Sequence, residues 1–226
     1  MAEKRHYATV AADVVLFAVS DNRLHVLLIR RGHPPYEGMW AFPGGIVETT
    51  EPLAAAARRE LAEETGIVDV PYLAQIGTFG DPKRDPRGRV ISVAYMGLLP
   101  RAEPVAGGDD AAQALWWAID TLPPLAFDHE GILKCALHRL RERVRQDPRV
   151  LFYLLPTPFV LQELQHVYEL VVGQESGARQ NIQRYVLKQG WVEPRHMRIL
   201  HKRGRPAREY VPREDAWVPS PEDECV

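Results

Sequence analysis

Short apolar runs alternate with polar turns through the first 150 residues, which is the pattern of a mixed α/β protein. Residues 7–19 are rich in β-branched side chains and end in a polar turn cluster at residues 20–22. A second apolar run follows directly at residues 25–30, so the two runs predict a β-hairpin. Further strands are expected at residues 72–79 and 90–99.

Two segments of the same region are predicted to be helical. Residues 49–52 combine hydroxyl, acidic and proline residues, which is typical of a helix start. An alanine-rich run continues to Thr65, and Gly66 is placed to end the helix. Residues 133–145 repeat apolar side chains at helical spacing and predict a second helix.

The pattern changes after a group of prolines, so we expect a domain boundary near residues 148–158. Two amphipathic helices follow, each ended by a glycine, and two short strands then flank a basic turn. The expected helices cover residues 159–172 and 178–189, and the basic turn covers residues 202–206.

The composition is that of an ordinary soluble protein. The 226 residues are 46% hydrophobic and 26% charged, which excludes collagen-like and wholly disordered chains. Cys135 and Cys225 are the two cysteines, so no disulfide framework holds the fold together and a reducing compartment is expected. No apolar stretch reaches the ~18–20 residues that span a bilayer. We therefore expect a cytoplasmic protein with no membrane partner.

The formal net charge of −2 hides an uneven distribution. Residues 177–213 hold ten Lys or Arg against two Glu, whereas residues 214–226 hold five acids and no Lys or Arg. A basic segment on an otherwise acidic chain predicts a polyanionic partner for that segment. The acidic tail at residues 214–226 is expected to be disordered.

Three glutamates share one face of the alanine-rich helix. At 100° per residue, Glu60, Glu63 and Glu64 occupy an arc of about 100°. Like charges at this spacing repel by ~0.2–0.5 kcal/mol per pair, and a divalent cation with oxygen ligands reverses the sign of that interaction. Arg59 can pair with Glu63, and Gly45 lets the loop backbone approach a phosphate or metal. Taken alone, three glutamates more often form a solvated acidic face.

The spacing around these glutamates decides between the two interpretations. The segment resembles the Nudix box at all nine of its positions, namely Gly45, Glu51, Arg59, Glu60, Leu61, Glu63, Glu64, Gly66 and Ile67. The resemblance implies an α/β/α sandwich with a mixed sheet over residues 1–150, which binds a nucleoside diphosphate linked to another moiety. It implies that Glu60, Glu63 and Glu64 hold Mg²⁺ or Mn²⁺ beside Gly45, that Glu63 alternatively activates water, and that Arg59 completes the catalytic set. Such metals neutralise the pyrophosphate and orient the attacking water.

Two further segments, residues 40–45 and 84–92, resemble stretches of Nudix proteins that act on ADP-ribose. They point to a set of candidate ligand-binding residues, although its arginines could equally be solvated surface charges. One departure is Gln113, which stands where that resemblance leads us to expect a glutamate and which cannot act as a base. Slow turnover is therefore expected, unless Asp109 or Asp110 substitutes. The candidates are Arg30, Arg31, Gly44, Gly45, Arg84 and Arg87.

The order helix, turn, helix, basic hairpin predicts a winged helix-turn-helix domain over residues 151–213. Polar residues of the second helix suit the edges of a DNA groove, and the basic hairpin tip suits the phosphate backbone. The same features are also common in proteins that bind no DNA, since basic helix faces and charged hairpins aid solubility. The candidate DNA-binding residues are Arg179, Gln183, Arg184, Lys188, Lys202, Arg203, Arg205 and Arg208.

Residues 155–164 and 204–210 resemble the corresponding stretches of NrtR-type Nudix-related transcriptional regulators. The resemblance implies a homodimer whose winged helices bind a palindromic double-stranded DNA operator, commonly near NAD-metabolism genes, while the Nudix domain senses ADP-ribose or a related nucleotide. The alternative is a metal-dependent ADP-ribose pyrophosphatase whose C-terminal module is structural or dimerising. RNA binding is disfavoured because few aromatic residues interleave the basic ones.

Overall fold

The computed structural model describes residues 7–105, 111–173, 181–199 and 206–222. A seven-stranded mixed sheet has the order β3-β2-β1-β6-β5, with β4 paired to β1 and β7 paired to β2. β1 and β6 are parallel at its centre, and the other pairs are antiparallel. The predicted hairpin and both later strands are confirmed. The strands are β1 (Thr9–Ser20), β2 (Arg23–Arg31), β3 (Trp40–Ala41), β4 (Gly44–Ile46), β5 (Tyr72–Phe79), β6 (Val90–Leu99) and β7 (Ala111–Ala118).

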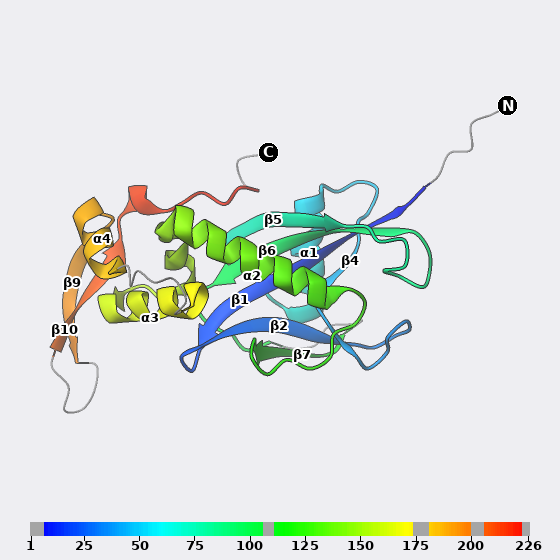
Figure 1. The fold of residues 1–226 in the computed structure, drawn as a ribbon, viewed down its shortest axis with the longest axis horizontal. Coiled ribbons are helices and arrows are strands. Elements are labelled where there is room, and N and C mark those ends of the chain that lie inside the picture. Colours follow the sequence, from blue (N-terminus) through cyan, green and yellow to red (C-terminus); the bar gives the residue numbers. More distant parts are fainter. Residues whose placement is uncertain (1–6, 106–110, 174–180, 200–205, 223–226) are drawn as a thin grey trace.

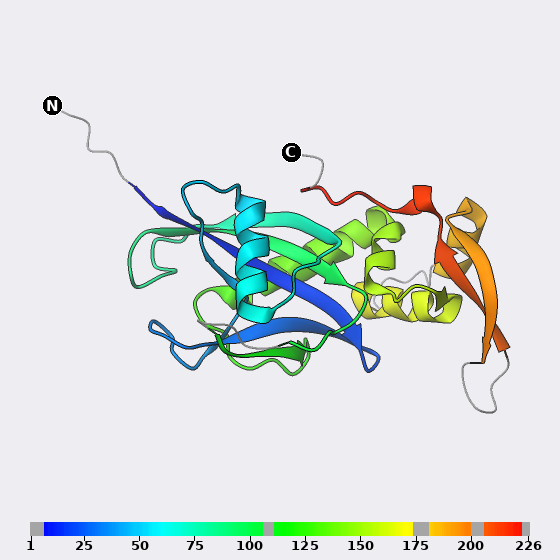
Figure 2. The ribbon, with the colours of Figure 1, turned by 180° about the vertical axis from the view of Figure 1, so that it is seen from behind.

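One helix covers each face of this sheet, as the views from opposite sides show (Figures 1 and 2). Alternate side chains of a strand point to opposite faces, so β1 supplies both layers of core. Val14 and Leu16 belong to the core with α1 (Leu53–Thr65), whereas Val15 and Phe17 belong to the core with α2 (His129–Gln146). The α/β/α sandwich is confirmed, although α2 begins four residues before the predicted start.

The helix that carries the glutamates ends as the sequence predicts. Gly66 adopts a left-handed conformation with φ of 78°, and its N–H donates to the Ala62 carbonyl. The start differs in detail, because Pro52 precedes the helix and supplies no side-chain cap. Glu51 instead accepts from the Glu48 N–H and pairs with Arg59, so this acid is part of the site.

The C-terminal module combines two helices with a three-stranded sheet of order β8-β10-β9. The predicted helix at residues 159–172 begins later, because its first two residues pair with β10 as a short strand. The described part of the next predicted helix starts at Ile182, and residues 178–180 lie outside the described residues. The elements are β8 (Phe159–Val160), α3 (Leu161–Val172), α4 (Ile182–Gln189), β9 (Val192–Ile199) and β10 (Pro206–Pro212).

The two parts of the chain share one hydrophobic core. The 3-10 helix η1 (Pro148–Leu154) follows α2, and its apolar residues are buried against α2, α3 and the sheet. Leu140 of α2 and Leu164 of α3 are both fully buried in this cluster. The predicted boundary region is therefore a packed junction.

The acidic tail docks on the edge strand β5. Ser220 Oγ donates to the Leu73 carbonyl at 2.6 Å and accepts from the Leu73 N–H at 3.0 Å. Glu222 accepts from the Gln75 N–H at 2.8 Å. The predicted disorder is therefore wrong for residues 214–222, because these side chains satisfy backbone groups that an edge strand leaves unpaired. Residues 223–226 lie outside the described residues.

Candidate ligand pocket and nucleic-acid interface

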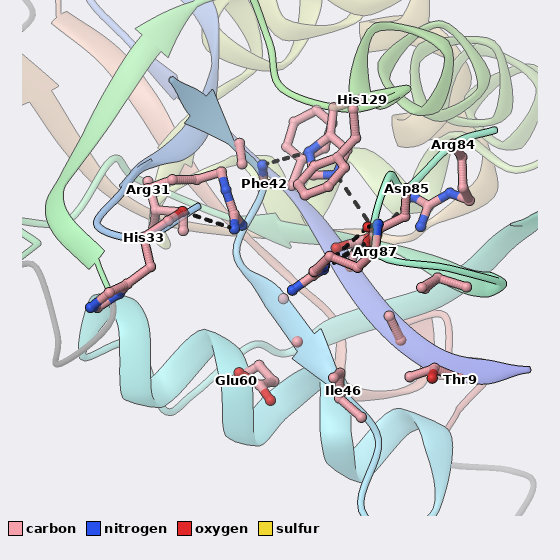
Figure 3. Close-up of a pocket in the computed structure, with 18 of the residues that line it drawn as sticks. Thr9, Arg31, His33, Phe42, Ile46, Glu60, Arg84, Asp85, Arg87 and His129 are labelled. Carbon is pink, nitrogen blue, oxygen red and sulfur yellow. Dashed lines mark hydrogen bonds and ion pairs between the residues drawn. The ribbon is translucent and has the colours of Figure 1, made fainter. Parts of the chain in front are cut away.

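A cavity of about 660 Å³ opens where β1 changes partners along one edge. Residues 17–20 of β1 pair with β2, whereas residues 11–13 pair with β4. Side chains from these strands, from α1, from the loop at residues 84–89 and from the start of α2 line the space. Figure 3 shows Glu60 of α1 on one side and Arg84, Asp85, Arg87 and His129 on the other. The cavity therefore has an acidic wall facing a wall rich in arginine.

Two glutamates of the predicted set, Glu60 and Glu64, line this cavity. Glu64 is buried, and its Oε2 accepts from the Gly44 N–H at 2.9 Å. Burial raises the pKa of Glu64 to about 8, and the negative charges of Glu60 and Asp13 add to the increase. The pKa of Glu60 is also raised, mainly by burial. In the absence of a cation, burial and the neighbouring carboxylates therefore favour the protonated form of Glu64 at neutral pH.

Arg59 organises the outer part of the acidic wall. Its guanidinium donates to both carboxylate oxygens of Glu51, at 2.6 and 3.0 Å, and to Glu60 at 2.9 Å. It also donates to Glu63 at 3.0 Å, which holds that exposed side chain outside the cavity. The hydrogen bonds to Glu51 raise the pKa of Arg59 and lower that of Glu51. Unlike Glu60 and Glu64, Glu63 therefore does not line the cavity in this structure.

Neither Gly45 nor Gly44 could carry a side chain without a clash. A Cβ on Gly45 would lie 2.3 Å from the Glu60 carboxylate, and one on Gly44 would lie 2.4 Å from the Ala12 carbonyl oxygen. The carboxylate of Glu60 thus rests directly against the loop backbone. Both glycines line the cavity.

The chemistry of the acidic wall fits a divalent cation in part. Nudix hydrolases generally use divalent metals. Glu60 and Glu64 supply hard oxygen donors, and their raised pKa values reflect repulsion and burial that a cation relieves. Over the residues that the structure describes, no group of three or more His, Cys, Asp or Glu is arranged to hold a metal ion. Glu63 would have to leave Arg59 to complete such a set.

The opposite wall contains a buried ionic network. Arg84, 7% exposed, donates to Asp128 through two nitrogens at 2.8 and 3.0 Å and lies 3.7 Å from Asp13. Asp13 is buried and accepts a hydrogen bond from Ser92. His129 accepts from the Phe42 N–H through Nδ1 at 3.0 Å, and burial lowers its pKa. The ring is therefore neutral, and its Nε2 lies 3.9 Å from Asp13.

An aromatic ring flanked by guanidinium groups forms part of the rim. Arg31 lies over the Phe127 ring at 4.9 Å and Arg87 at 5.9 Å, and Tyr36 meets the same ring edge-on at 4.7 Å. The Arg87 side chain also donates three hydrogen bonds to the buried Asp85 carboxylate, at 2.7, 3.0 and 3.3 Å. Cations beside an aromatic face suit a ligand that is both anionic and planar.

The structure separates the predicted ligand residues into two groups. Arg31, Gly44, Gly45, Arg84 and Arg87 line the cavity. Arg30 does not, because successive residues of a strand face opposite sides and its Nε donates to the Gly38 carbonyl. The placement of Arg30 therefore argues against a direct ligand contact.

Sequence reasoning missed Asp13, Phe127 and Asp128. Asp13 was detectable as a lone acid within an apolar strand, where a buried charge requires a partner. Phe127 and Asp128 lie in a loop before α2, and nothing in the local pattern connects them to residue 84. Gln113 lies on β7 opposite Arg30, and Asp109 and Asp110 lie outside the described residues.

The candidate DNA-binding surface is described in part. Gln183, Arg184 and Lys188 lie on α4, whose buried side is formed by Ile182 and Val186. Arg184 and Lys188 are exposed, as is Arg208 of β10, so these cations are available to a partner. The remaining predicted residues, Arg179, Lys202, Arg203 and Arg205, lie outside the described residues.

Two family models match the two parts of the chain. The NUDIX domain model matches residues 9–136, and the model described as the NrtR DNA-binding winged helix domain matches residues 151–211. Within the described residues, no helix is long and apolar enough to cross a membrane.

Two curated relatives match different shares of the chain. The chain is 35% identical over 188 residues to the ADPR responsive transcriptional repressor NtrR of Acinetobacter baylyi, covering 81% of this chain and 74% of that one. It is 40% identical over 128 residues to the ADP-ribose pyrophosphatase of Methanocaldococcus jannaschii, covering 57% and 72% of the two chains.

Two solved structures of Shewanella oneidensis NrtR extend the comparison. The one complexed with a 27mer DNA has a TM-score of 0.75 and 31% identity, covering 92% of this chain and 94% of that one. The NUDIX domain complexed with ADP ribose has a TM-score of 0.57 and 33% identity, covering 60% and 90%.

Fold and site together define a two-domain class, in which a Nudix sandwich with an acidic helix precedes a winged helix module. The chain belongs to the NrtR family of Nudix-related transcriptional regulators.

Proposed function

We propose that this protein is a transcriptional regulator whose DNA binding responds to ADP-ribose or a related nucleoside diphosphate derivative. The observation that carries the proposal is the joining, in one core, of a charged cavity and a winged helix module. A sensor needs both parts in one chain, whereas a hydrolase needs the cavity alone. Similarity to an ADPR responsive repressor over most of the chain supports the same conclusion.

The ligand would lie between the two walls of the cavity. Arg31, Arg84 and Arg87 supply positive charge for a diphosphate, since guanidinium groups pair well with phosphate oxygens. Gly44 and Gly45 line the cavity with their backbone, and the missing side chain of Gly45 lets the Glu60 carboxylate rest against it. The cavity volume of about 660 Å³ is typical of sites for small ligands.

Mg²⁺ or Mn²⁺ would be held by Glu60 and Glu64 beside Gly45, with Glu63 joining once it leaves Arg59. A bound divalent ion would neutralise the diphosphate and lower the pKa of a bound water. Arg59 would keep Glu60 oriented toward the cavity through its 2.9 Å hydrogen bond. These roles rest on the donor chemistry of the acidic wall.

Hydrolysis of ADP-ribose is a second candidate function, favoured by the retention of Glu60 and Glu64 at the cavity. Release of AMP from ADP-ribose with Mg²⁺ or Mn²⁺, lost in Glu64→Gln, is the expected result if the protein hydrolyses its ligand. Absence of AMP with both metals contradicts hydrolysis and leaves the regulatory function intact. Slow hydrolysis is compatible with a sensor, because it would reset the ligand-bound state.

The DNA partner would be a double-stranded operator bound by a homodimer. Two recognition helices of a dimer must match half-sites about 34 Å apart. Gln183 and Arg184 of α4 would enter the groove, whereas Lys188 and Arg208 would contact phosphates, as would Arg179, Lys202, Arg203 and Arg205. NAD-metabolism genes are the proposed targets, and the cytoplasm is the proposed location, where operator and nucleotide coexist.

Binding of labelled DNA from the region upstream of the protein's own gene tests this function. We expect a specific complex whose affinity changes about 5–150-fold with saturating ADP-ribose and Mg²⁺. Arg184→Ala should weaken the specific complex, and Lys188→Ala, which removes the proposed phosphate contact, should reduce the slope of its salt dependence by about one unit. Arg101→Ala removes an exposed arginine from the Nudix part and serves as the matched control. No specific complex, or one that ignores ADP-ribose, contradicts the proposal.

A further inference from the structure

Arg84 belongs at once to the cavity and to the start of helix α2. It lines the cavity and is almost fully buried, yet its two ion-pair hydrogen bonds go to Asp128, the residue that immediately precedes α2. Asp128 is about a quarter exposed and is not among the residues lining the cavity. The Arg84 guanidinium group thus links the cavity to the residue that precedes the first turn of α2.

The neighbouring contacts fix the same turn to the cavity wall. His129, the first residue of α2, accepts from the Phe42 N–H and stacks on the Phe42 ring, with centroids 5.2 Å apart and planes 10° apart. Phe127 lies 5.5 Å from the His129 ring and touches the cavity through Arg31. A ligand that rearranges Arg84 or Arg31 therefore acts directly on the start of α2.

The other end of α2 is attached to the C-terminal module. Arg141 Nε donates to the Val171 carbonyl of α3 at 3.1 Å. Leu140 and Val144 are fully buried in the core that contains Leu164 and Val171. Figure 1 shows α2 crossing the sheet and ending beside α3. At 1.5 Å per residue, its 18 residues span about 27 Å between the cavity and this module.

We propose that Arg84, Asp128 and helix α2 transmit ligand binding to the winged helix domain, with Arg84 changing partner from Asp128 to a phosphate of the ligand. The inference rests on the proposed function and assigns the regulation of the same site. The two states of the protein differ in the partner of the Arg84 guanidinium group. In the structure Arg84 pairs with Asp128 and α2 is anchored, and in the ligand-bound state a phosphate takes the guanidinium and the anchor is released.

A change at the start of α2 reaches α3 because the helix is rigid and tightly packed at its end. Packed interiors respond to small shifts by moving whole elements and do not deform continuously. A displaced α3 carries α4 with it, since Leu164 of α3 and Ile182 and Val186 of α4 share one core. The spacing of two recognition helices in a dimer then changes.

Asp128→Asn tests the proposal because it removes the charge that competes for Arg84 and keeps the size of the side chain. Glu130→Gln is the matched control, since Glu130 is an exposed acid in the same helical turn. The ratio of DNA dissociation constants with and without ADP-ribose is measured for the wild type and both variants. We expect the ratio to fall toward one in Asp128→Asn and to keep the wild-type value in Glu130→Gln. The affinity of Asp128→Asn for ADP-ribose should equal or exceed that of the wild type.

A wild-type ratio in Asp128→Asn overturns this inference while leaving the proposed function standing. A wild-type protein that binds no DNA, or whose DNA binding ignores ADP-ribose, refutes both. Arg141→Gln, which breaks the contact between α2 and α3 far from the cavity, should also reduce the ratio while ADP-ribose affinity stays unchanged.

Hydrogen exchange in the wild-type protein decides the matter if Asp128→Asn fails to fold. Saturating ADP-ribose should change amide exchange in the first turns of α2 and in α3. Protection confined to the cavity loops, with exchange along α2 unchanged, contradicts transmission through this helix.

Discussion

The two helices that cover the sheet have different neighbours. The buried face of α1 packs in a core formed by the Nudix sheet and its loops, and the same helix directs Glu60 and Glu64 into the cavity. The inner face of α2 packs in a core that continues through η1 into α3 and α4. One helix thus presents chemical groups, and the other joins the cavity to the DNA-binding module.

Because the two helices have different neighbours, similar substitutions in α1 and in α2 should affect different activities of the protein. A change in α1 should alter ligand or metal binding and leave DNA binding without ligand intact. A change in the buried face of α2 should alter the module that binds DNA. Each expectation below tests that separation.

The largest effects should come from the cores themselves. Leu61→Ala and Leu140→Ala each truncate a buried leucine, and we expect each to lower the free energy of unfolding by about 2–5 kcal/mol. Chemical denaturation measures both losses. Leu140→Ala should also weaken DNA binding without ligand at a temperature where both variants are folded. Equal DNA binding by the two variants contradicts the division between α1 and α2.

Glu64→Gln should stabilise the metal-free protein at high pH. The pKa of folded Glu64, about 8, exceeds its ordinary value of 4.5, so the folded state holds a proton that the unfolded state releases between these values. Wild-type stability is therefore lost as pH rises from about 4.5 through 8, and the variant should lack this loss. Thermal melting in EDTA between pH 5 and 9 measures the difference.

Adding Mg²⁺ at pH 8 sharpens the same comparison. A cation bound at Glu60 and Glu64 should raise the melting temperature of the wild type by mass action and raise that of Glu64→Gln much less. Equal shifts in the two proteins would place the cation elsewhere.

Ser220→Ala should have an intermediate effect. It removes two buried hydrogen bonds to Leu73, at about 1–3 kcal/mol for polar groups left unsatisfied, although the edge position lets water replace part of the loss. Limited proteolysis should then cut the tail near residue 217 faster than in the wild type. An unchanged cleavage rate would mean that the packing of Trp217 against Tyr153, at 4.9 Å, holds the tail without Ser220.

The smallest effect is expected on the outer face of α2. Glu142 pairs with His138 and Arg139 in solvent, so Glu142→Gln should change stability by less than about 0.5 kcal/mol. Its DNA binding should respond to ADP-ribose as the wild type does. A lost response would show that the exposed side of α2 takes part in transmission.

Local signals in the sequence were sufficient to predict the main helices and strands of the fold. The helix of the glutamates was predicted with its end at Gly66, because a left-handed glycine is a local feature. The hairpin of β1 and β2 follows from two apolar runs and a two-residue turn at Asp21 and Asn22, which both adopt positive φ.

Interactions between distant segments could not be predicted. Ser220 lies 147 residues from Leu73 in the sequence. The acidic composition of the tail does not indicate that it packs against an edge strand, so the expectation of a disordered tail is wrong for the described part. Arg84 was a ligand candidate, but its partner Asp128 is 44 residues away in an irregular loop. The side-chain direction of Glu63 depends on Arg59, which also binds Glu51 and Glu60, and spacing alone does not show which glutamate turns outward.

Calorimetric titration of ADP-ribose, with Mg²⁺, into the free protein and into its complex with operator DNA tests the central claim most directly. Because coupling between two sites is reciprocal, the two dissociation constants for ADP-ribose should differ by the same factor by which ADP-ribose changes DNA affinity, about 5–150-fold. Equal dissociation constants for the free and DNA-bound protein would show that cavity and winged helix are uncoupled, and would contradict the account.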